Sequence, residues 1–248
     1  MAECVVSLGM EIQDLAKWEE SFANYLRSNL SQDDGSHDLG HFQRVWRAAR
    51  YINQEEGAIA DPLILLTAAY FHDLVSLPKN HPDRSKSSLL SAEKTVELLK
   101  SNFAGFPSEK IEGVRHAILA HSFSANIEPE TPEAMILQDA DRLEAVGAIG
   151  LARVFYTAGQ LNHKLFHPDD PLAMHRKPDD RQYALDHFGL KLLRLPDLMN
   201  TRTGRRLADE NAAYLVEFLK KIKAEIEGNY SDEDTARRDG TDAVRREG

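Results

Sequence analysis

A His-Asp doublet, His72-Asp73, stands near the C-terminal end of an apolar run over residues 62–74. Burying an ionisable pair among apolar side chains costs free energy unless its charge is compensated. A divalent cation would compensate it, because imidazole nitrogen and carboxylate oxygen are both ligands for such ions. If the doublet binds a metal, the fold must bring further ligands to it from other segments of the chain.

Length and composition are those of an ordinary globular protein. The 248 residues suit one large domain or two small ones, and a hydrophobic fraction of 42% is enough to build a core. The formal net charge of −10 argues against nonspecific nucleic-acid binding, which requires a basic face. We therefore expect no stable nucleic-acid complex, although local cations and a metal could still bind a small anion.

The single cysteine, Cys4, excludes an intrachain disulfide and favours a reducing compartment. The N-terminus lacks the charged start and long apolar core of a signal peptide. The longest apolar stretch, residues 58–71, is interrupted by Asp61 and Pro62 and is too short to span a bilayer. These features predict a cytoplasmic protein without membrane association. A homo-oligomer is compatible with the sequence.

Apolar residues recur at helical spacing, and no strand-like alternation runs through the sequence. Leu15, Trp18 and Phe22, for example, follow one another at three- and four-residue steps, which is typical of an amphipathic helix. Acceptor-proline pairs such as Asp61-Pro62 mark helix starts. The expected helices cover residues 11–30, 37–54, 62–77, 88–103, 108–121, 131–157, 183–195 and 203–228.

Three prolines within residues 163–181 predict a long loop, which is either a surface loop or a lid. The last twenty residues, 229–248, are polar and charged, and we expect them to be disordered. The chain is therefore predicted to be all-α, with a single domain over residues 1–228 that ends in a helical C-terminal extension.

Two further segments offer metal ligands: His41 lies one helix before the doublet, and Asp141 lies on a later, otherwise apolar helix. With His72 and Asp73 they make two imidazoles and two carboxylates, a set suited to Mn, Fe, Co or Ni. Taken singly, each could instead be a paired core residue. Asp139 points elsewhere on the helix than Asp141, and we expect it to make a structural hydrogen bond.

The order His41, His72-Asp73, Asp141 on separate helices resembles the HD superfamily of metal-dependent phosphohydrolases. Its small stand-alone bacterial branch, which includes nucleotide pyrophosphohydrolases, is similar in the flanking blocks. Those blocks are residues 72–82 after the doublet, residues 138–153 around Asp141, and Lys191-Leu192-Leu193 with Met199-Asn200-Thr201 near the end.

The resemblance spans residues 20–225. It implies an HD-domain helical core in which His41, His72, Asp73 and Asp141 bind a divalent cation. Manganese is the leading candidate, and nickel, cobalt, iron and magnesium are the others.

The resemblance also implies that Asp73 contacts the attacking water. His116 and His121 lie where related enzymes place site histidines, either for a second metal or for the substrate phosphate. Because they are five residues apart, their directions on a helix diverge by roughly 140°. Both can reach one site only if the helix ends or bends between them.

Charge builds up on phosphoryl oxygens in the transition state, so cations around the cleft should help. Lys79, Arg84 and Lys86 follow the doublet, and Arg44 lies on nearly the same helix face as His41. We expect these four cations to contact substrate phosphate. The three that follow the doublet could equally belong to a solvated loop.

The sequence thus predicts a metal-dependent phosphohydrolase acting on a nucleotide or a related phosphorylated small molecule. Release of pyrophosphate from a nucleoside triphosphate is the sharper form of this prediction. The alternatives are a phosphomonoesterase acting on nucleoside monophosphates, and a non-catalytic nucleotide-binding regulatory module.

Overall fold

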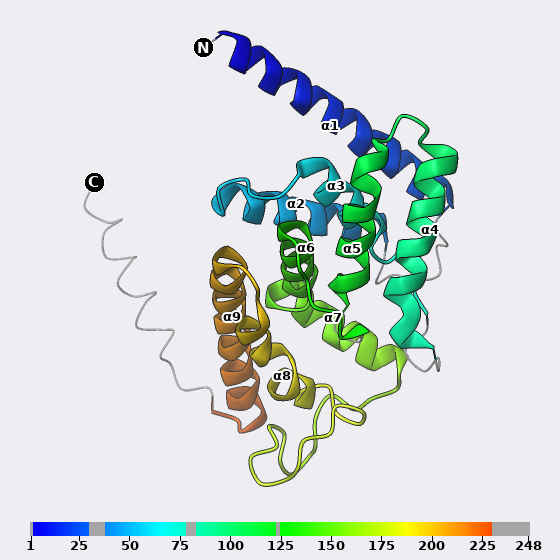
Figure 1. Ribbon diagram of the computed structural model, residues 1–248. Coiled ribbons are helices and arrows are strands. Elements are labelled where there is room, and N and C mark those ends of the chain that lie inside the picture. The colour runs from blue at the N-terminus through cyan, green and yellow to red at the C-terminus, as the bar shows by residue number, and fades with distance from the viewer. Residues whose placement is uncertain (1, 30–37, 78–82, 123–124, 230–248) are drawn as a thin grey trace, which may run out of the picture.

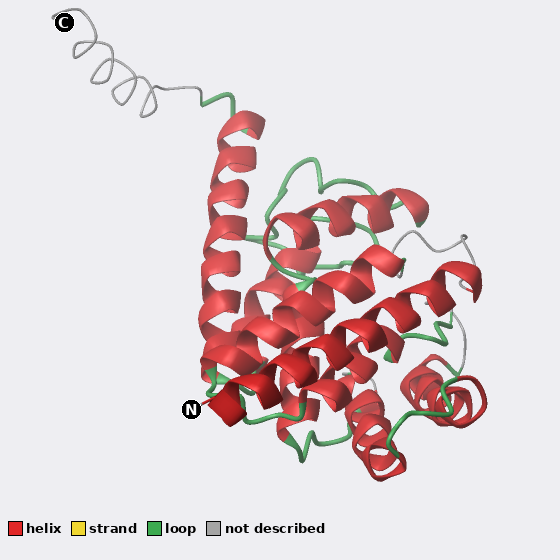
Figure 2. Ribbon diagram, turned by 90° about the horizontal axis from the view of Figure 1, so that it is seen from above, coloured by secondary structure: helices red, strands yellow, loops and turns green. Residues whose placement is uncertain are grey.

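The computed structural model of the protein describes residues 2–29, 38–77, 83–122 and 125–229. Lys79 and the predicted tail beyond Asn229 lie outside these ranges. Figure 2 shows helices throughout the described part of the chain and no strand, apart from one isolated bridge between Lys164 and Tyr183. The all-α prediction is confirmed.

A long loop after residue 160 leads to the last three helices (Figure 1). In chain order the helices are α1 (Ala2–Asn29), α2 (Leu39–Glu55), α3 (Pro62–Phe71), η1 (Arg84–Lys86), α4 (Ser87–Asn102), η2 (Ser108–Lys110), α5 (Ile111–His121), α6 (Pro132–Leu143), α7 (Gly147–Gln160), α8 (Asp186–Leu190), η4 (Leu192–Leu198) and α9 (Arg202–Ile226). None of the helices in these described ranges has the length and apolar character that crossing a membrane requires.

Helix α3 forms the centre of the main core, and it contacts α1, α2, α4, α5 and α6. Every residue from 65 to 71 is buried, because this short segment is apolar on all sides. The C-terminal half of α1 closes one end of the core with Trp18 and Phe22, which pack against the ring of Phe103. The N-terminal half of α1 extends beyond the other helices (Figure 1).

A smaller apolar cluster joins α7, α8, η4 and α9. Phe188 of α8 stacks on Phe218 of α9 with ring centroids 5.9 Å apart, and Phe155 of α7 contacts both rings. This cluster is the helical C-terminal extension predicted from the sequence. The loop over residues 161–185 lies at its far end (Figure 1).

The predicted helix starts at Asp61 and Thr131 are confirmed. The Asp61 carboxylate accepts from the backbone N–H groups of Leu63 and Ile64, and the Thr131 hydroxyl accepts from that of Ala134. Satisfying these otherwise unpaired donors stabilises the first turn. Proline follows each cap at the first helical position, as the sequence indicated.

Two predicted helices end earlier than expected. The helix over residues 131–157 is split into α6 and α7, because Gly147 has a φ of +72°, which a continuous right-handed helix does not allow. Helix α3 ends at Phe71, so the doublet lies just beyond its last turn rather than within it. As a result, His72 and Asp73 lie at the end of α3, and Asp141 and Glu144 lie at the end of α6.

Candidate metal centre

His72 occupies the C-terminal cap of α3, and its side chain is completely buried. Its Nδ1 lies 3.0 Å from the carbonyl oxygen of Ala69. A carbonyl can only accept a hydrogen bond, so Nδ1 carries a proton, and in the neutral imidazole Nε2 has the lone pair. The end of α3 therefore orients this imidazole as a ligand through Nε2.

His41, on the first turn of α2, is also completely buried and is oriented in the same way. Its Nδ1 lies 3.4 Å from Oε2 of Glu144, a carboxylate that accepts a hydrogen bond from Nδ1–H, and its Nε2 lies 3.1 Å from Nε2 of His72. Two lone pairs that face each other at this distance repel. A cation between them would satisfy both nitrogens, so this donor pair fits a metal ion.

The two carboxylates complete the cluster. Oδ1 of Asp141, on the last turn of α6, lies 3.7 Å from His41 Nε2 and 3.6 Å from His72 Nε2. Oδ2 of Asp73 lies 4.0 Å from His72 Nε2. One atom each from His41, His72 and Asp73 lie within 4.8 Å of one another. The structure thus brings together all four residues that were predicted as ligands.

His121, the last residue of α5, joins the same cluster. Its Nδ1 lies 2.6 Å from the carbonyl oxygen of Ile118, and its Nε2 lies 3.4 Å from Oδ1 of Asp73. Together with His72 and Asp141 it forms a second group whose ligand atoms lie within 4.8 Å of one another. A third imidazole therefore points its Nε2 at the centre.

The electrostatics of the cluster suit a metal site. Burial lowers the pKa of His41 more than its hydrogen bond to Glu144 raises it, which favours the neutral form that binds metals. Burial would also lower the pKa of His72, but the contact with Asp141 and the charge of Asp73 raise it overall. Burial opposes ionisation of Asp141, but contact with His72 and the charge of the histidines hold its pKa well below its usual range. The imidazoles thus keep Asp141 ionised.

The guanidinium of Arg44 contacts the Glu144 carboxylate. Its Nε lies 3.1 and 2.9 Å from the two oxygens of that carboxylate, and Nη2 lies 2.8 Å from Oε2. Glu144 in turn contacts His41, so the three side chains form one chain of contacts. The arrangement supports Arg44 as a residue that positions a ligand, rather than the phosphate contact expected from the sequence.

A cavity of about 240 Å³ adjoins the cluster. Its lining includes Asp73, His121 and Asp141 of the metal cluster and three arginines. The lining residues outside the cluster are Ser76, Arg84, Ser87, Ser88, Ser122, Arg142, Ala145, Arg153 and Leu195. Of the cations predicted to follow the doublet, the cavity contains Arg84.

The other predicted contacts lie elsewhere. His116 accepts a hydrogen bond from the backbone N–H of Glu130 at 3.1 Å, and it does not line the cavity. Lys86 is exposed and pairs with Asp83 at 2.7 Å. Lys79 lies outside the described residues.

Sequence reasoning missed three residues here: Glu144, Arg142 and Arg153. All three stand in the block around Asp141 that carried the family resemblance. A signal was present for Arg153, which is the only charged residue among residues 147–160. No such signal was available for Glu144, because its partner His41 is 103 residues away in the chain.

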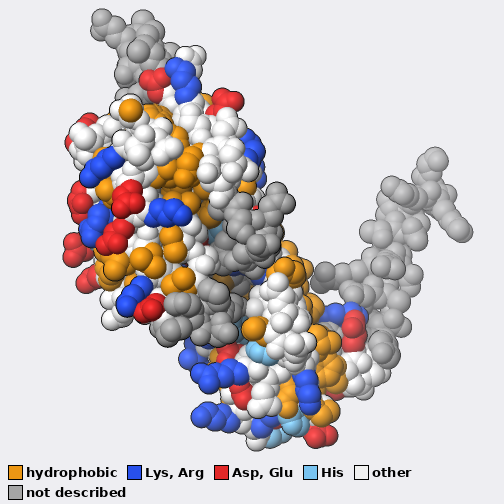
Figure 3. All heavy atoms as spheres, turned by 90° about the vertical axis from the view of Figure 1, so that its right-hand side faces the viewer, with side chains coloured by type: hydrophobic (Ala, Val, Ile, Leu, Met, Phe, Trp, Pro, Cys, Tyr) orange, Lys and Arg blue, Asp and Glu red, His pale blue; other side chains and the backbone are white. Residues whose placement is uncertain are grey.

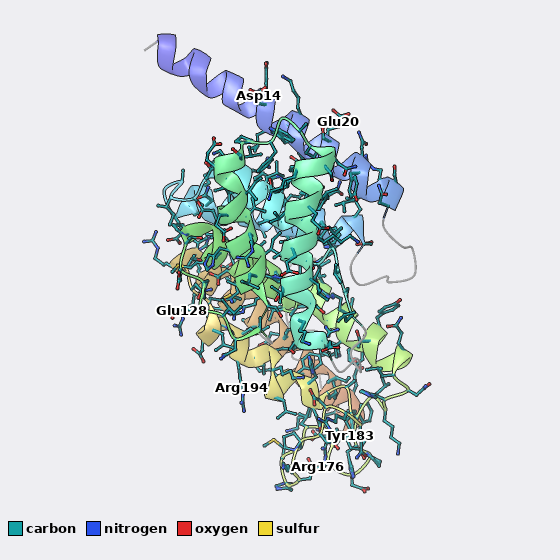
Figure 4. The ribbon with its side chains drawn as sticks, turned by 45° about the vertical axis from the view of Figure 1, so that its right-hand side comes forward. Asp14, Glu20, Glu128, Arg176, Tyr183 and Arg194 are labelled. Atoms are coloured by element: carbon teal, nitrogen blue, oxygen red, sulfur yellow. The ribbon has the colours of Figure 1, made fainter. Side chains whose placement is uncertain are left out.

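We expect Glu144→Gln to lower metal affinity by about 10- to 100-fold, because glutamine keeps the shape of the side chain but removes the charge that orients His41. Titration of the protein with Mn²⁺ against a competing chelator measures this. Glu128→Gln, at an exposed glutamate (Figure 4), is the matched control and should leave the affinity unchanged. Equal affinities for both variants would remove Glu144 from the site.

Comparison with known proteins agrees with this geometry. The HD domain model matches residues 38–146, the segment that contains every predicted metal ligand. The uncharacterized protein YpgQ of Bacillus subtilis is 36% identical over 216 residues, which cover 86% of this chain and 95% of that protein.

Solved structures share the fold. The crystal structure of Bacillus subtilis YpgQ in complex with ADP is similar with a TM-score of 0.63 and 34% identity, over 85% of this chain and 99% of that one. An HD-superfamily hydrolase from Bacillus thuringiensis gives a TM-score of 0.65 at 28% identity, over 85% of this chain and 97% of that one. The protein therefore belongs to the HD-domain family, as one of its small bacterial type.

Proposed function

We propose that the protein is a metal-dependent phosphohydrolase that acts on nucleotides. The observation that carries this proposal is the clustering of His41, His72, Asp73 and Asp141 beside a cavity that is lined by Asp73, Asp141 and three arginines. Mixed nitrogen and oxygen ligands suit a divalent ion such as Mn²⁺, and arginines suit the charge of a phosphoryl group. The ADP complex of YpgQ supports a nucleotide as the substrate.

His41, His72, Asp73 and Asp141 would hold the cation. When bound, such an ion polarises a phosphoryl oxygen and lowers the pKa of water, so that hydroxide forms at neutral pH. Asp73 would accept the proton of the attacking water, and its Oδ1, which lies 3.4 Å from His121 Nε2, supports this role. His121 would then stabilise the Asp73 carboxyl group through this contact. Arg84, Arg142 and Arg153 would bind the phosphate oxygens, where charge develops.

Within this class, cleavage of a nucleoside triphosphate to a monophosphate and pyrophosphate is our specific proposal. A phosphomonoesterase uses the same metal chemistry and differs in which phosphorus atom the cavity places at the metal. The presence of all four ligands in one cluster, together with cations around a cavity, favours an enzyme over a non-catalytic nucleotide-binding module.

The test is product identification with purified protein that has been stripped with a chelator and reloaded with Mn²⁺. We expect turnover of nucleoside triphosphates with release of pyrophosphate, and none in the stripped protein. Release of inorganic phosphate from monophosphates alone would indicate the phosphomonoesterase. Tight nucleotide binding without turnover of any compound in a panel of phosphate esters and anhydrides would overturn the enzyme proposal.

A further inference from the structure

A second cavity, of about 430 Å³, meets the cavity of the metal centre at Ala145 and Arg153, which line both. It lies between α7 and the segment that runs from the long loop to the start of η4. Its other lining residues include Val154, Thr157, Ala158 and Leu161 on one segment and Arg181 and Lys191 on the other.

The loop that forms one wall of this cavity is held in place by specific contacts. Arg176 makes a two-point ion pair with the buried Asp186, with Nη1–Oδ2 and Nη2–Oδ1 distances of 2.5 and 2.6 Å. The Arg176 guanidinium also lies 4.7 Å from the ring centroid of Tyr183 (Figure 4). These contacts join the predicted long loop to α8.

The second cavity is cationic in a chain of formal net charge −10. Its lining contains three cationic side chains, Arg153, Arg181 and Lys191, and one carboxylate, Asp180. Lysine, arginine and histidine side chains are also prominent on this lower part of the molecule in Figure 3. An anionic ligand is the chemistry that such a balance favours.

The Asp180 carboxylate already has partners within the protein. Asp180 accepts hydrogen bonds from His187 Nδ1 and Lys191 Nζ, each at 2.9 Å. Burial would raise the pKa of Asp180, but these contacts lower it overall, so it is ionised and paired at neutral pH. Arg153 and Arg181, by contrast, make no side-chain hydrogen bond or ion pair to any residue in the described ranges. Their charges are therefore open to a ligand.

The position of Arg153 indicates the chemical class of that ligand. It stands at the junction of the two cavities, and the metal ligands Asp73 and Asp141 line the first of them. The larger cavity beyond it has an apolar wall of Val154, Ala158 and Leu161, as a site for an aromatic or sugar group requires. A ligand that spans both cavities has its phosphates in the first cavity and an extended, partly apolar end beyond Arg153.

We propose that Arg153 binds the phosphate chain of the substrate between the two cavities, and that the larger cavity holds the nucleoside. This rests on the nucleotide substrate of the proposed function and defines the substrate class as nucleoside di- and triphosphates. Guanidinium binds phosphate with two parallel hydrogen bonds, so lysine would not replace it fully.

The test is the affinity of the Mn²⁺-loaded protein for ADP and for pyrophosphate, measured by calorimetry, which needs no turnover. Arg153→Gln should weaken ADP binding by about 10- to 100-fold, and Arg153→Lys should recover part of this loss. Arg194→Gln changes an exposed arginine on η4 (Figure 4) that lines neither cavity, and should have no effect. We expect the Mn²⁺ affinity of Arg153→Gln to be unchanged. This result would show that the loss of ADP binding does not come from damage to the metal centre.

Thr157→Phe fills the larger cavity, whereas Thr157→Val keeps its space and serves as the matched control. We expect Thr157→Phe to weaken ADP binding and to leave pyrophosphate binding unchanged. Equal ADP affinity in wild type and Arg153→Gln, no effect of Thr157→Phe, or no ADP binding by wild type would each overturn the inference. Product analysis of the wild type tests the proposed function separately. Turnover with an unaffected Arg153→Gln variant therefore rejects only the role of Arg153.

Discussion

Replacing Asp73 with alanine is expected to lower turnover by about a thousandfold and to release the bound metal ion. Asp73 is predicted to have two roles: it would bind the metal ion, and it would accept the proton of the attacking water. One of its oxygens lies near His72 and the other near His121. A metal ion contributes several kcal/mol to stabilising the charge that develops in the transition state, and about 4 kcal/mol corresponds to a thousandfold in rate. Neither role is available to a methyl group.

The experiment measures both metal content and turnover, because each role has its own readout. Circular dichroism should show unchanged helix content, since Asp73 lies beyond the last turn of α3. Asp83→Ala is the matched control, because Asp83 is a nearby carboxylate that lines neither cavity. Normal activity with full metal content in the Asp73→Ala protein would remove this residue from the site.

Asp139→Ala is expected to have the largest effect on stability, lowering the free energy of unfolding by about 3 to 5 kcal/mol. The buried Asp139 carboxylate accepts from the backbone and side-chain N–H groups of Asn200 at 2.8 and 2.9 Å. It also accepts from the backbone N–H and hydroxyl of Thr201 at 2.8 and 2.7 Å. Alanine would leave these donors without an acceptor.

The structural hydrogen bonding predicted for Asp139 is confirmed, and it joins α6 to the start of α9. Gly204 lies so close to this carboxylate that a Cβ there would stand 2.3 Å from Oδ2. Urea unfolding followed by circular dichroism measures the loss, and Asp139→Asn should fall between wild type and alanine. Asp209→Ala, an exposed carboxylate on α9, is the control. A loss below 1 kcal/mol for Asp139→Ala would show that water replaces the lost acceptor.

Predictions succeeded where the signal is local or ordered along the chain. Helix starts at Asp61 and Thr131 were recognisable because a capping side chain bonds to backbone N–H groups only two or three residues further along the chain. The order of His41, the doublet and Asp141 was recognisable through family resemblance, and side-chain contacts link all four in the structure. The break at Gly147 was missed because apolar spacing continues through it.

Only the three-dimensional fold shows which of several similar residues belong to the site. His116 and His121 share α5, yet the cluster contains only His121, because the helix ends there and the two side chains point in different directions. Arg44 was expected at the phosphate, but it contacts Glu144 from 100 residues away. Arg153 was not considered, and it stands where the two cavities meet.

By itself, the sequence determined that this chain is helical, where several of its helices begin, and which four side chains could bind a metal. These properties follow from short-range periodicity, from capping hydrogen bonds and from the chemistry of each side chain. Tertiary structure alone decided which imidazole nitrogens face the centre, which cations remain without a partner, and where a substrate has room. These depend on contacts between residues far apart in the chain, such as His41 and Glu144 at 103 positions, and packing, rather than spacing along the chain, sets such distances.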